Sequence, residues 1–160
     1  MTVYHGAIQQ VRKPIVEKGR PSTDFGKGFY TTTNFEQAKN WALIKQRNSR
    51  EDTKAIVNIY EVDDELLKNT TFDVRTFNAP DEEWLNFVVG CRKGELHQHE
   101  IVFGPVANDK IYVTIAQYEN HLLDLDATIA RLKINEVYNQ ISFHSETALS
   151  ELLFIEHLEV

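Results

Sequence analysis

The stretch from Asp24 to Ala42, "DFGKGFYTTTNFEQAKNWA", most constrains how this chain folds, because it joins three kinds of local structure without a spacer. Two glycines around Lys27 indicate a loop, and the aromatic and β-branched run of residues 29–33 indicates a short strand. Asn34 is a preferred helix N-cap, Gln37 stands in the reciprocal capping position, and apolar residues then recur at helical spacing. The stretch therefore predicts a loop, a strand and a helix in direct succession.

The rest of the chain alternates between strand and helix patterns. Further strands are predicted at residues 2–8, 54–62, 71–74, 100–107, 137–144 and 152–160, and further helices at 80–94, at 122–133 and from about 146. Strands in both halves with helices inserted between them indicate an α+β fold. The 160 residues contain no repeat and no linker rich in Pro, Gly or Ser, so we expect a single domain over residues 1–160.

Composition excludes several classes of protein. The single cysteine, Cys91, cannot form an internal disulfide, and we interpret it as a small buried side chain rather than a nucleophile. No apolar run approaches the ~18 residues of a membrane span, and the first ten residues lack the basic start and apolar core of a secretory signal. We therefore expect a protein of the reducing cytoplasm.

Charge is unevenly distributed along the chain. The net charge of −7 argues against a general nucleic-acid scaffold. Residues 1–50 nevertheless hold nine Lys/Arg and three acidic residues, a net charge of +6, whereas the remaining 110 residues have a net charge of −13. Such a distribution favours a small phosphorylated ligand at one face, although two ordinary solvated faces would give the same pattern.

One histidine pair raises the question of a metal. His97 and His99 precede Glu100 in "HQHEIVFGP", but no third ligand follows at a spacing typical of zinc sites. We therefore interpret the pair as part of a solvated loop and predict no metal site.

Three blocks of sequence resemble the ADP-ribosyltransferase superfamily, in its diphtheria-toxin and poly(ADP-ribose) polymerase branch. They are "YHG" at residues 4–6, "FGKGFY" at 25–30 and "YNQISFHSETALSELLFIEHLEV" at 138–160. More narrowly, "DFGKGFYTT", "GPVAND" and the ending with Gln140 and Phe143–Ser145 are similar to a bacterial family of small transferase-like domains, often encoded beside short antitoxin-like proteins. The resemblance implies an ADP-ribosyltransferase-like fold, with split antiparallel sheets around an NAD cleft and inserted helices.

The resemblance also implies roles for individual residues toward NAD. His5 would hydrogen-bond the adenosine ribose, Gly6 would leave room for the nicotinamide carboxamide, and the Tyr30 ring would stack on the nicotinamide. Glycines at 26 and 28 would let the backbone approach the diphosphate, and Arg20 and Lys27 would supply positive charge to it. The NAD-binding set is then His5, Gly6, Arg20, Gly26, Lys27, Gly28, Tyr30, Thr31 and Gln140, with His5, Tyr30 and Gln140 catalytic.

Gln140 departs from the family pattern, in which most active members have a glutamate. An amide keeps the hydrogen-bonding capacity of a carboxylate but has no negative charge and cannot act as a general base. Another carboxylate could contribute, and Glu100 and Glu83 are the candidates. Glutamine also suffices if the acceptor is already a strong nucleophile.

The resemblance leads to one expected function and two alternatives. We expect NAD-dependent transfer of ADP-ribose to a macromolecular acceptor, protein or nucleic acid, by a bacterial toxin or phage-defence effector that a small antitoxin-like partner restrains. An inactive module that binds NAD or ADP-ribose is the first alternative. An RNA 2′-phosphotransferase, which uses a related pocket, is the second.

Overall fold

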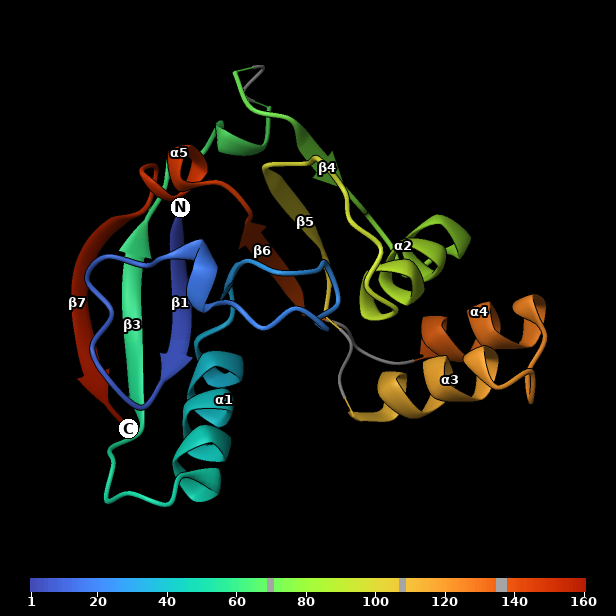
Figure 1. Cartoon of the computed structure of the whole chain (residues 1–160), viewed down its shortest axis with the longest axis horizontal. Coiled ribbons are helices and arrows are strands. Elements are labelled where there is room, and N and C mark those ends of the chain that lie inside the picture. The colour runs from blue at the N-terminus through green and yellow to red at the C-terminus, as the bar shows by residue number, and fades with distance from the viewer. Residues whose placement is uncertain (69–70, 107–108, 135–137) are drawn as a thin grey trace.

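The strands of the protein form one open sheet. In the computed structural model, which describes residues 1–68, 71–106, 109–134 and 138–160, the strand order is β4-β5-β6-β2-β1-β3-β7 (Figure 1). The strands are β1 (Thr2–Ala7), β2 (Phe29–Thr32), β3 (Ile56–Glu61), β4 (Val74–Thr76), β5 (Ile101–Pro105), β6 (Asn139–Phe143) and β7 (Leu153–Glu159). Strands β4 and β5 are parallel, and the other described neighbours are antiparallel.

Five α-helices of the described residues accompany this sheet. They are α1 (Phe35–Asn48), α2 (Glu82–Arg92), α3 (Asp109–Glu119), α4 (Leu125–Ile134) and the one-turn α5 (Glu146–Leu149). Helix α1 packs along β1 and β3, whereas α2, α3 and α4 gather at the end that carries β4 and β5 (Figure 1). The α+β prediction is confirmed. None of the helices in the described ranges combines the length and apolarity that crossing a membrane requires.

The junction of β1 and β2 differs from the expected split between two sheets. The two strands share a single register pair, Tyr4 with Thr32, so one sheet results, but its halves are barely joined. Beyond that pair the strands diverge, and the His5 side chain contacts the Tyr30 carbonyl instead, with Nδ1 and the oxygen 2.6 Å apart. A side chain thus replaces a ladder hydrogen bond at the centre of the molecule.

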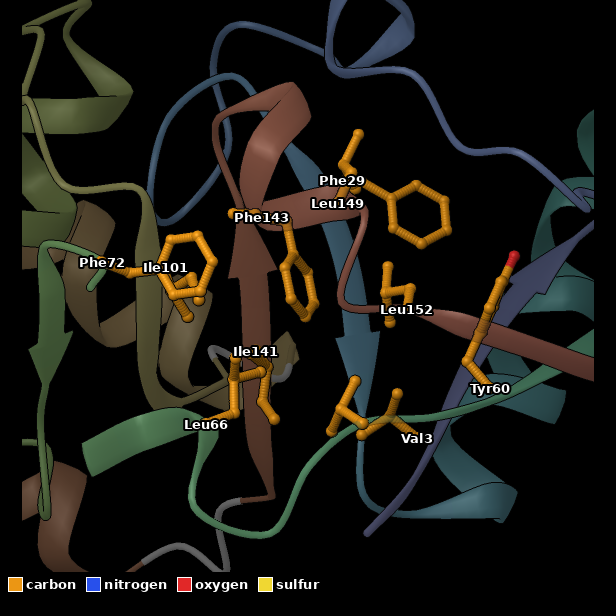
Figure 2. Packing of buried hydrophobic residues seen from close by; sticks show 12 residues of the cluster. Val3, Phe29, Tyr60, Leu66, Phe72, Ile101, Ile141, Phe143, Leu149 and Leu152 are labelled. Atoms are coloured by element: carbon orange, nitrogen blue, oxygen red, sulfur yellow. The ribbon is translucent and has the colours of Figure 1, made fainter. Parts of the chain in front are cut away.

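Buried side chains form two clusters, one on each face of the sheet. Figure 2 shows the first cluster, in which Phe29, Ile101 and Phe143 pack together. The next residues along two of these strands, Tyr30 and Val102, belong to the second cluster, under α2, α3 and α4. This alternation is the period of two that a strand imposes. Since Ile141 and Phe143 lie in the first cluster, Gln140 lies on the same face as Tyr30.

The start of helix α1 and its N-cap, Asn34, were predicted correctly, but the reciprocal cap from Gln37 was not. Asn34 Oδ1 accepts from the Gln37 backbone N–H at 2.9 Å, as an N-cap does. The reciprocal bond from the Gln37 side chain is absent. Thr32 Oγ1 instead accepts from the Asn34 N–H at 3.1 Å and donates to Gln37 Oε1 at 2.5 Å. Thr32 therefore ties the end of β2 to the first turn of α1.

One strand boundary and one helix also differ from the sequence prediction. The strand expected at residues 71–74 is β4, which begins only at Val74, and no helix was expected where α3 lies. Part of the predicted strand at 137–144 lies outside the described residues, since position 137 is not described.

Candidate functional site

A pocket of about 620 Å³ opens where β1 and β2 diverge. Its walls come from strands β1, β2 and β6, helices α1 and α3, and the loop between β1 and β2. Seven of the nine residues predicted to bind NAD line it, namely His5, Gly6, Arg20, Gly28, Tyr30, Thr31 and Gln140. Gly26 and Lys27 do not, and Lys27 pairs with Glu17, their Nζ and Oε2 atoms being 2.5 Å apart. The structure thus brings together segments from opposite ends of the chain.

His5 is held as a neutral imidazole. Because the Tyr30 carbonyl can only accept, Nδ1 carries the proton and donates to it at 2.6 Å. The ring stacks on Phe29 with centroids 4.3 Å apart. Burial, reinforced by the charge of Lys45, lowers the pKa of His5 to about 3. Nε2 is therefore an unprotonated acceptor on the pocket wall, with no hydrogen-bond partner among the described residues.

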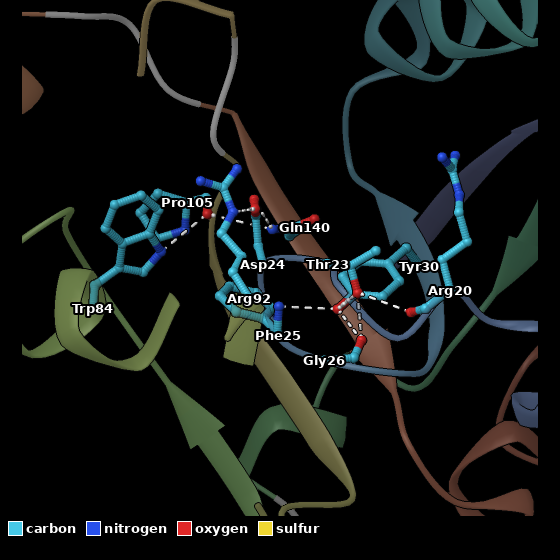
Figure 3. Close-up of polar contacts among 10 residues, drawn as sticks. All are labelled: Arg20, Thr23, Asp24, Phe25, Gly26, Tyr30, Trp84, Arg92, Pro105 and Gln140. Carbon is cyan, nitrogen blue, oxygen red and sulfur yellow. Dashed lines mark hydrogen bonds and ion pairs between the residues drawn. The ribbon is translucent and has the colours of Figure 1, made fainter. Parts of the chain in front are cut away.

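Tyr30 fixes the loop in front of the pocket. Its hydroxyl donates to the Gly26 carbonyl at 2.6 Å and accepts from the Phe25 N–H at 3.0 Å and from Thr23 Oγ1 at 2.9 Å (Figure 3). Burial raises the pKa of the Tyr30 phenol well above its usual range. The hydroxyl is therefore fully used in structure, and the ring is what Tyr30 offers to a ligand.

The Gln140 amide has one possible orientation. Its side chain is buried, and Nε2 lies 3.3 Å from Asp24 Oδ2 and 3.5 Å from the Pro105 carbonyl oxygen (Figure 3). Both neighbours are acceptors, so the amide nitrogen must face them, and its two hydrogens are occupied. Only Oε1 remains for a ligand, and it presents an acceptor, as a carboxylate oxygen would. The adjacent Thr31 is buried, with Oγ1 donating to the Ile141 carbonyl at 3.0 Å.

The glycines of the motifs have structural reasons of their own. A Cβ on Gly6 would lie 2.1 Å from the Ala38 carbonyl oxygen, so helix α1 itself requires glycine there. Gly26 has φ = +79°, a turn conformation that side chains disfavour. A Cβ on Gly28 would meet His144 Nδ1 at 2.7 Å. These contacts give each of the three glycines a structural reason.

The lining of the pocket is strongly basic. Among the described residues it includes one acidic side chain, Asp24, and five basic ones, Arg12, Lys13, Lys18, Arg20 and Lys45. Lys45 donates through Nζ to the Gly6 carbonyl at 2.6 Å. Burial and the nearby Arg20 charge lower the pKa of Lys45 to about 8. The positive charge that the sequence concentrates in its first third is thus partly gathered around one cavity.

Sequence reasoning missed Asp24 and Lys45. Asp24 stood in the quoted motif but was not assigned a role. Lys45 follows Ala38 and Trp41 at helical spacing, and all three line the pocket. That spacing was the available signal for Lys45, whereas nothing in the sequence linked Asp24 to Gln140.

The carboxylates proposed to assist Gln140 lie elsewhere. Glu100 accepts from Ser145 Oγ at 2.8 Å and Glu83 pairs with Arg75, and neither lines the pocket. The suggestion that one of them contributes is therefore wrong for this structure. In the described ranges, no group of three or more His, Cys, Asp or Glu could hold a metal. Cys91 is buried, and burial raises the pKa of its thiol to about 11.

The site defines a class: an α+β protein with a basic pocket at the junction of two half-sheets. The chain belongs to the family described as "Protein of unknown function (DUF3990)", whose sequence model matches residues 1–154 and so includes every residue of the site. No curated protein matches the chain at a significant level of similarity.

Proposed function

We propose that this protein is an NAD-dependent ADP-ribosyltransferase, with a fold of that type, which transfers ADP-ribose to a macromolecular acceptor. One observation carries the proposal. His5, Tyr30 and Gln140 come from the three separate sequence blocks of the resemblance, and all three line the same pocket. Chance would not be expected to bring three blocks together around one cavity.

The pocket suits NAD in size and charge. Its volume of about 620 Å³ lies within the roughly 300–1,000 Å³ typical of small-molecule sites. The five basic side chains would attract the diphosphate. His5 Nε2 and Gln140 Oε1 are acceptors, which is what two ribose hydroxyls require. The Tyr30 ring supplies an aromatic surface for the nicotinamide.

The proposed reaction breaks one bond and forms another at the same carbon. The C–N bond between the ribose and the nicotinamide breaks, both electrons leave with the nicotinamide, and the ribose passes through an oxocarbenium-like state. A nucleophile of the acceptor then bonds to that carbon and releases a proton. Gln140 holds the ribose, while Tyr30 and Gly6 hold the leaving group.

The resemblance supports a biological role as a bacterial toxin or phage-defence effector. Such an enzyme would act in the cytoplasm, where its single cysteine suits reducing conditions. It would consume NAD or modify an essential macromolecule, and a small antitoxin-like protein would hold it in check.

A second candidate is a binding module that has lost transfer activity. Lys45 occupies the Gly6 carbonyl, which the nicotinamide carboxamide would use in an active family member, and Gln140 lacks the usual negative charge. Such a protein would bind NAD or ADP-ribose in the same pocket and release no nicotinamide.

Nicotinamide release from NAD distinguishes the two candidates. We expect release by the purified protein, and we expect Gln140→Ala to lower it by about 100- to 1,000-fold, because a contact that strengthens in the transition state is lost. Asn139→Ala, which alters the exposed neighbour of Gln140 on β6, is the matched control and should leave the rate unchanged.

In bacteria, the wild-type chain should slow growth and His5→Ala should relieve the effect, while the exposed His157→Ala should not. Binding of NAD without release would support the module instead.

A further inference from the structure

Asp24 is a buried carboxylate on the wall of the pocket. It is 7% exposed and belongs to the loop that precedes β2. Among the described residues, Gln140 and Arg92 flank it. Gln140 Nε2 lies 3.3 Å from Oδ2, and Arg92 Nε lies 3.3 Å from Oδ1 (Figure 3). Burying a charge is costly unless it is paired, so this arrangement needs a reason beyond filling space.

Arg92 stands behind Asp24 as seen from the pocket. It comes from the end of α2, its side chain is only 11% exposed, and it does not line the cavity. Its guanidinium lies over the Tyr112 ring, 3.7 Å from the centroid. The cation therefore stabilises an ionised Asp24, while the carboxylate and the amide remain on the pocket side.

The hydrogen bond from Gln140 transmits the charge of Asp24. A carboxylate that accepts from an amide N–H polarises the amide and makes its oxygen a stronger acceptor. The Pro105 carbonyl takes the second amide hydrogen and also accepts from Trp84 Nε1 at 3.1 Å. Since Trp84 is fully buried, the core of the protein fixes the position of this acceptor and with it the Gln140 side chain.

We infer that Asp24 orients the Gln140 amide and supplies the negative charge that this amide lacks, so that the two residues together meet the nicotinamide ribose of NAD. The inference rests on the proposed transferase activity. Neither Asp24 nor Gln140 transfers a proton, because the amide oxygen accepts a hydrogen bond from the ribose and the ionised carboxylate only balances the positive charge that develops there. Asp24 is thus a positioning residue that acts through Gln140.

Exchanging the two functional groups tests the inference. Gln140→Glu alone would set two carboxylates side by side, and one of them would hold a proton at neutral pH. Asp24→Asn alone would remove the charge. The double variant Asp24→Asn/Gln140→Glu returns one carboxylate and one amide to the same site at nearly unchanged volume. We expect each single variant to lower kcat for nicotinamide release by about 100-fold with little change in KM, and the double variant to recover to within about tenfold of wild type.

The controls separate a charge effect from loss of structure. Asp126→Asn removes one negative charge from an exposed position at the start of α4 and should leave kcat unchanged. Melting temperatures measure the stability of each variant. The double variant should melt at a higher temperature than the sum of the two single changes predicts. Between pH 6 and 8, Gln140→Glu should gain activity more steeply than wild type as its extra proton is lost.

If the wild type is active, either of two results would overturn the inference. One is full activity in Asp24→Asn or in Gln140→Glu. The other is a double variant in which the changes in log kcat and in melting temperature equal the sums of the changes in the two single variants. A wild type that releases no nicotinamide would instead overturn the proposed function, while the melting temperatures would still report whether the two side chains are coupled.

Discussion

Single side chains in this pocket hold the fold together and face the ligand space at the same time. Tyr30 fixes its loop through three hydrogen bonds of its hydroxyl, and His5 bridges two diverging strands through Nδ1. Replacing either by alanine therefore removes a structural contact along with any ligand contact. For Tyr30, the comparison of Tyr30→Phe with Tyr30→Ala separates the two, since only the first keeps the ring.

Lys45 should make NAD binding depend on pH. Its pKa is lowered to about 8 by burial and by Arg20, so the free protein loses this charge as pH rises through that value. An anionic ligand favours the charged form, so NAD should bind about tenfold more weakly at pH 9.5 than at pH 7, which corresponds to about 1.4 kcal/mol. Calorimetric titration across this range measures the change.

Lys45→Gln provides the sharpest comparison for this pH dependence. The amide can still donate to the Gly6 carbonyl, but it has no charge to lose, so binding should be weaker at pH 7 and nearly flat up to pH 9.5. Lys39→Gln, on the same helix but outside the pocket, should behave like wild type. An equal decline in Lys45→Gln and wild type would show that another group is responsible.

At the scale of elements, the close contact between β1 and α1 decides the geometry of the pocket. Gly6 lies against the backbone of α1, where a Cβ would sit 2.1 Å from the Ala38 carbonyl oxygen and 2.8 Å from the Ala42 nitrogen. Neither atom can move without moving the helix. The contact brings Lys45 to the Gly6 carbonyl and Trp41 to the pocket wall, so the glycine positions a functional surface by packing.

Gly6→Ala should therefore destabilise the protein before it affects any ligand. Overpacking of this kind typically costs about 1–3 kcal/mol, which for a chain of this size lowers the melting temperature by roughly 2–12 °C. Gly94→Ala is the matched control. Gly94 has φ = +94° and nothing within 4 Å of its Cβ position, so it reports conformational strain without a clash. A smaller loss of stability in Gly6→Ala than in Gly94→Ala would contradict the packing argument.

The sequence predicted some elements well because their signals are local. The N-cap Asn34 and the apolar spacing behind it sufficed for α1. Helix α3 was missed because its run of β-branched and aromatic residues, "IYVTI", is typical of a strand. Its helical state follows from packing, since Ile111 and Ile115 are both buried at the i, i+4 spacing against the second cluster. Tertiary contact here overrides local preference.

The residues of the candidate site could likewise be predicted only where the signal is local. His5, Gly6, Tyr30 and Gln140 could be assigned because each lies in a motif, and all four line the pocket. The partnership of Asp24 with Gln140 joins residues 116 positions apart, and no pattern in one sequence reports such a pair. Lys27 also lies in a motif, but its pairing with Glu17 could only be learned from the folded chain.

At the scale of the whole molecule, histidines link stability to pH. His97 and His144 lie against each other with ring centroids 4.7 Å apart, between the loop before β2 and the end of β6. Burial lowers the pKa of both, that of His144 to about 4, and it lowers the pKa of His5 to about 3. All three therefore stay neutral in the folded protein at pH values where the unfolded chain protonates its histidines.

This difference predicts a loss of stability in mild acid. Below the unfolded pKa of about 6.5 the unfolded state binds protons that the folded state does not, so the free energy of unfolding should fall from about pH 6.5 toward pH 4. His144 alone should give a slope approaching 1.4 kcal/mol per pH unit. In His144→Gln the amide can still donate to the Lys27 carbonyl and accept from Ser142, the partners that the imidazole has in the wild type. Urea unfolding at pH 7.5, 6.5 and 5.5 should show a shallower decline for this variant than for wild type, whereas the exposed His157→Gln should match wild type. Equal slopes in all three proteins would mean that carboxylates, not these buried histidines, control the acid limit of the fold.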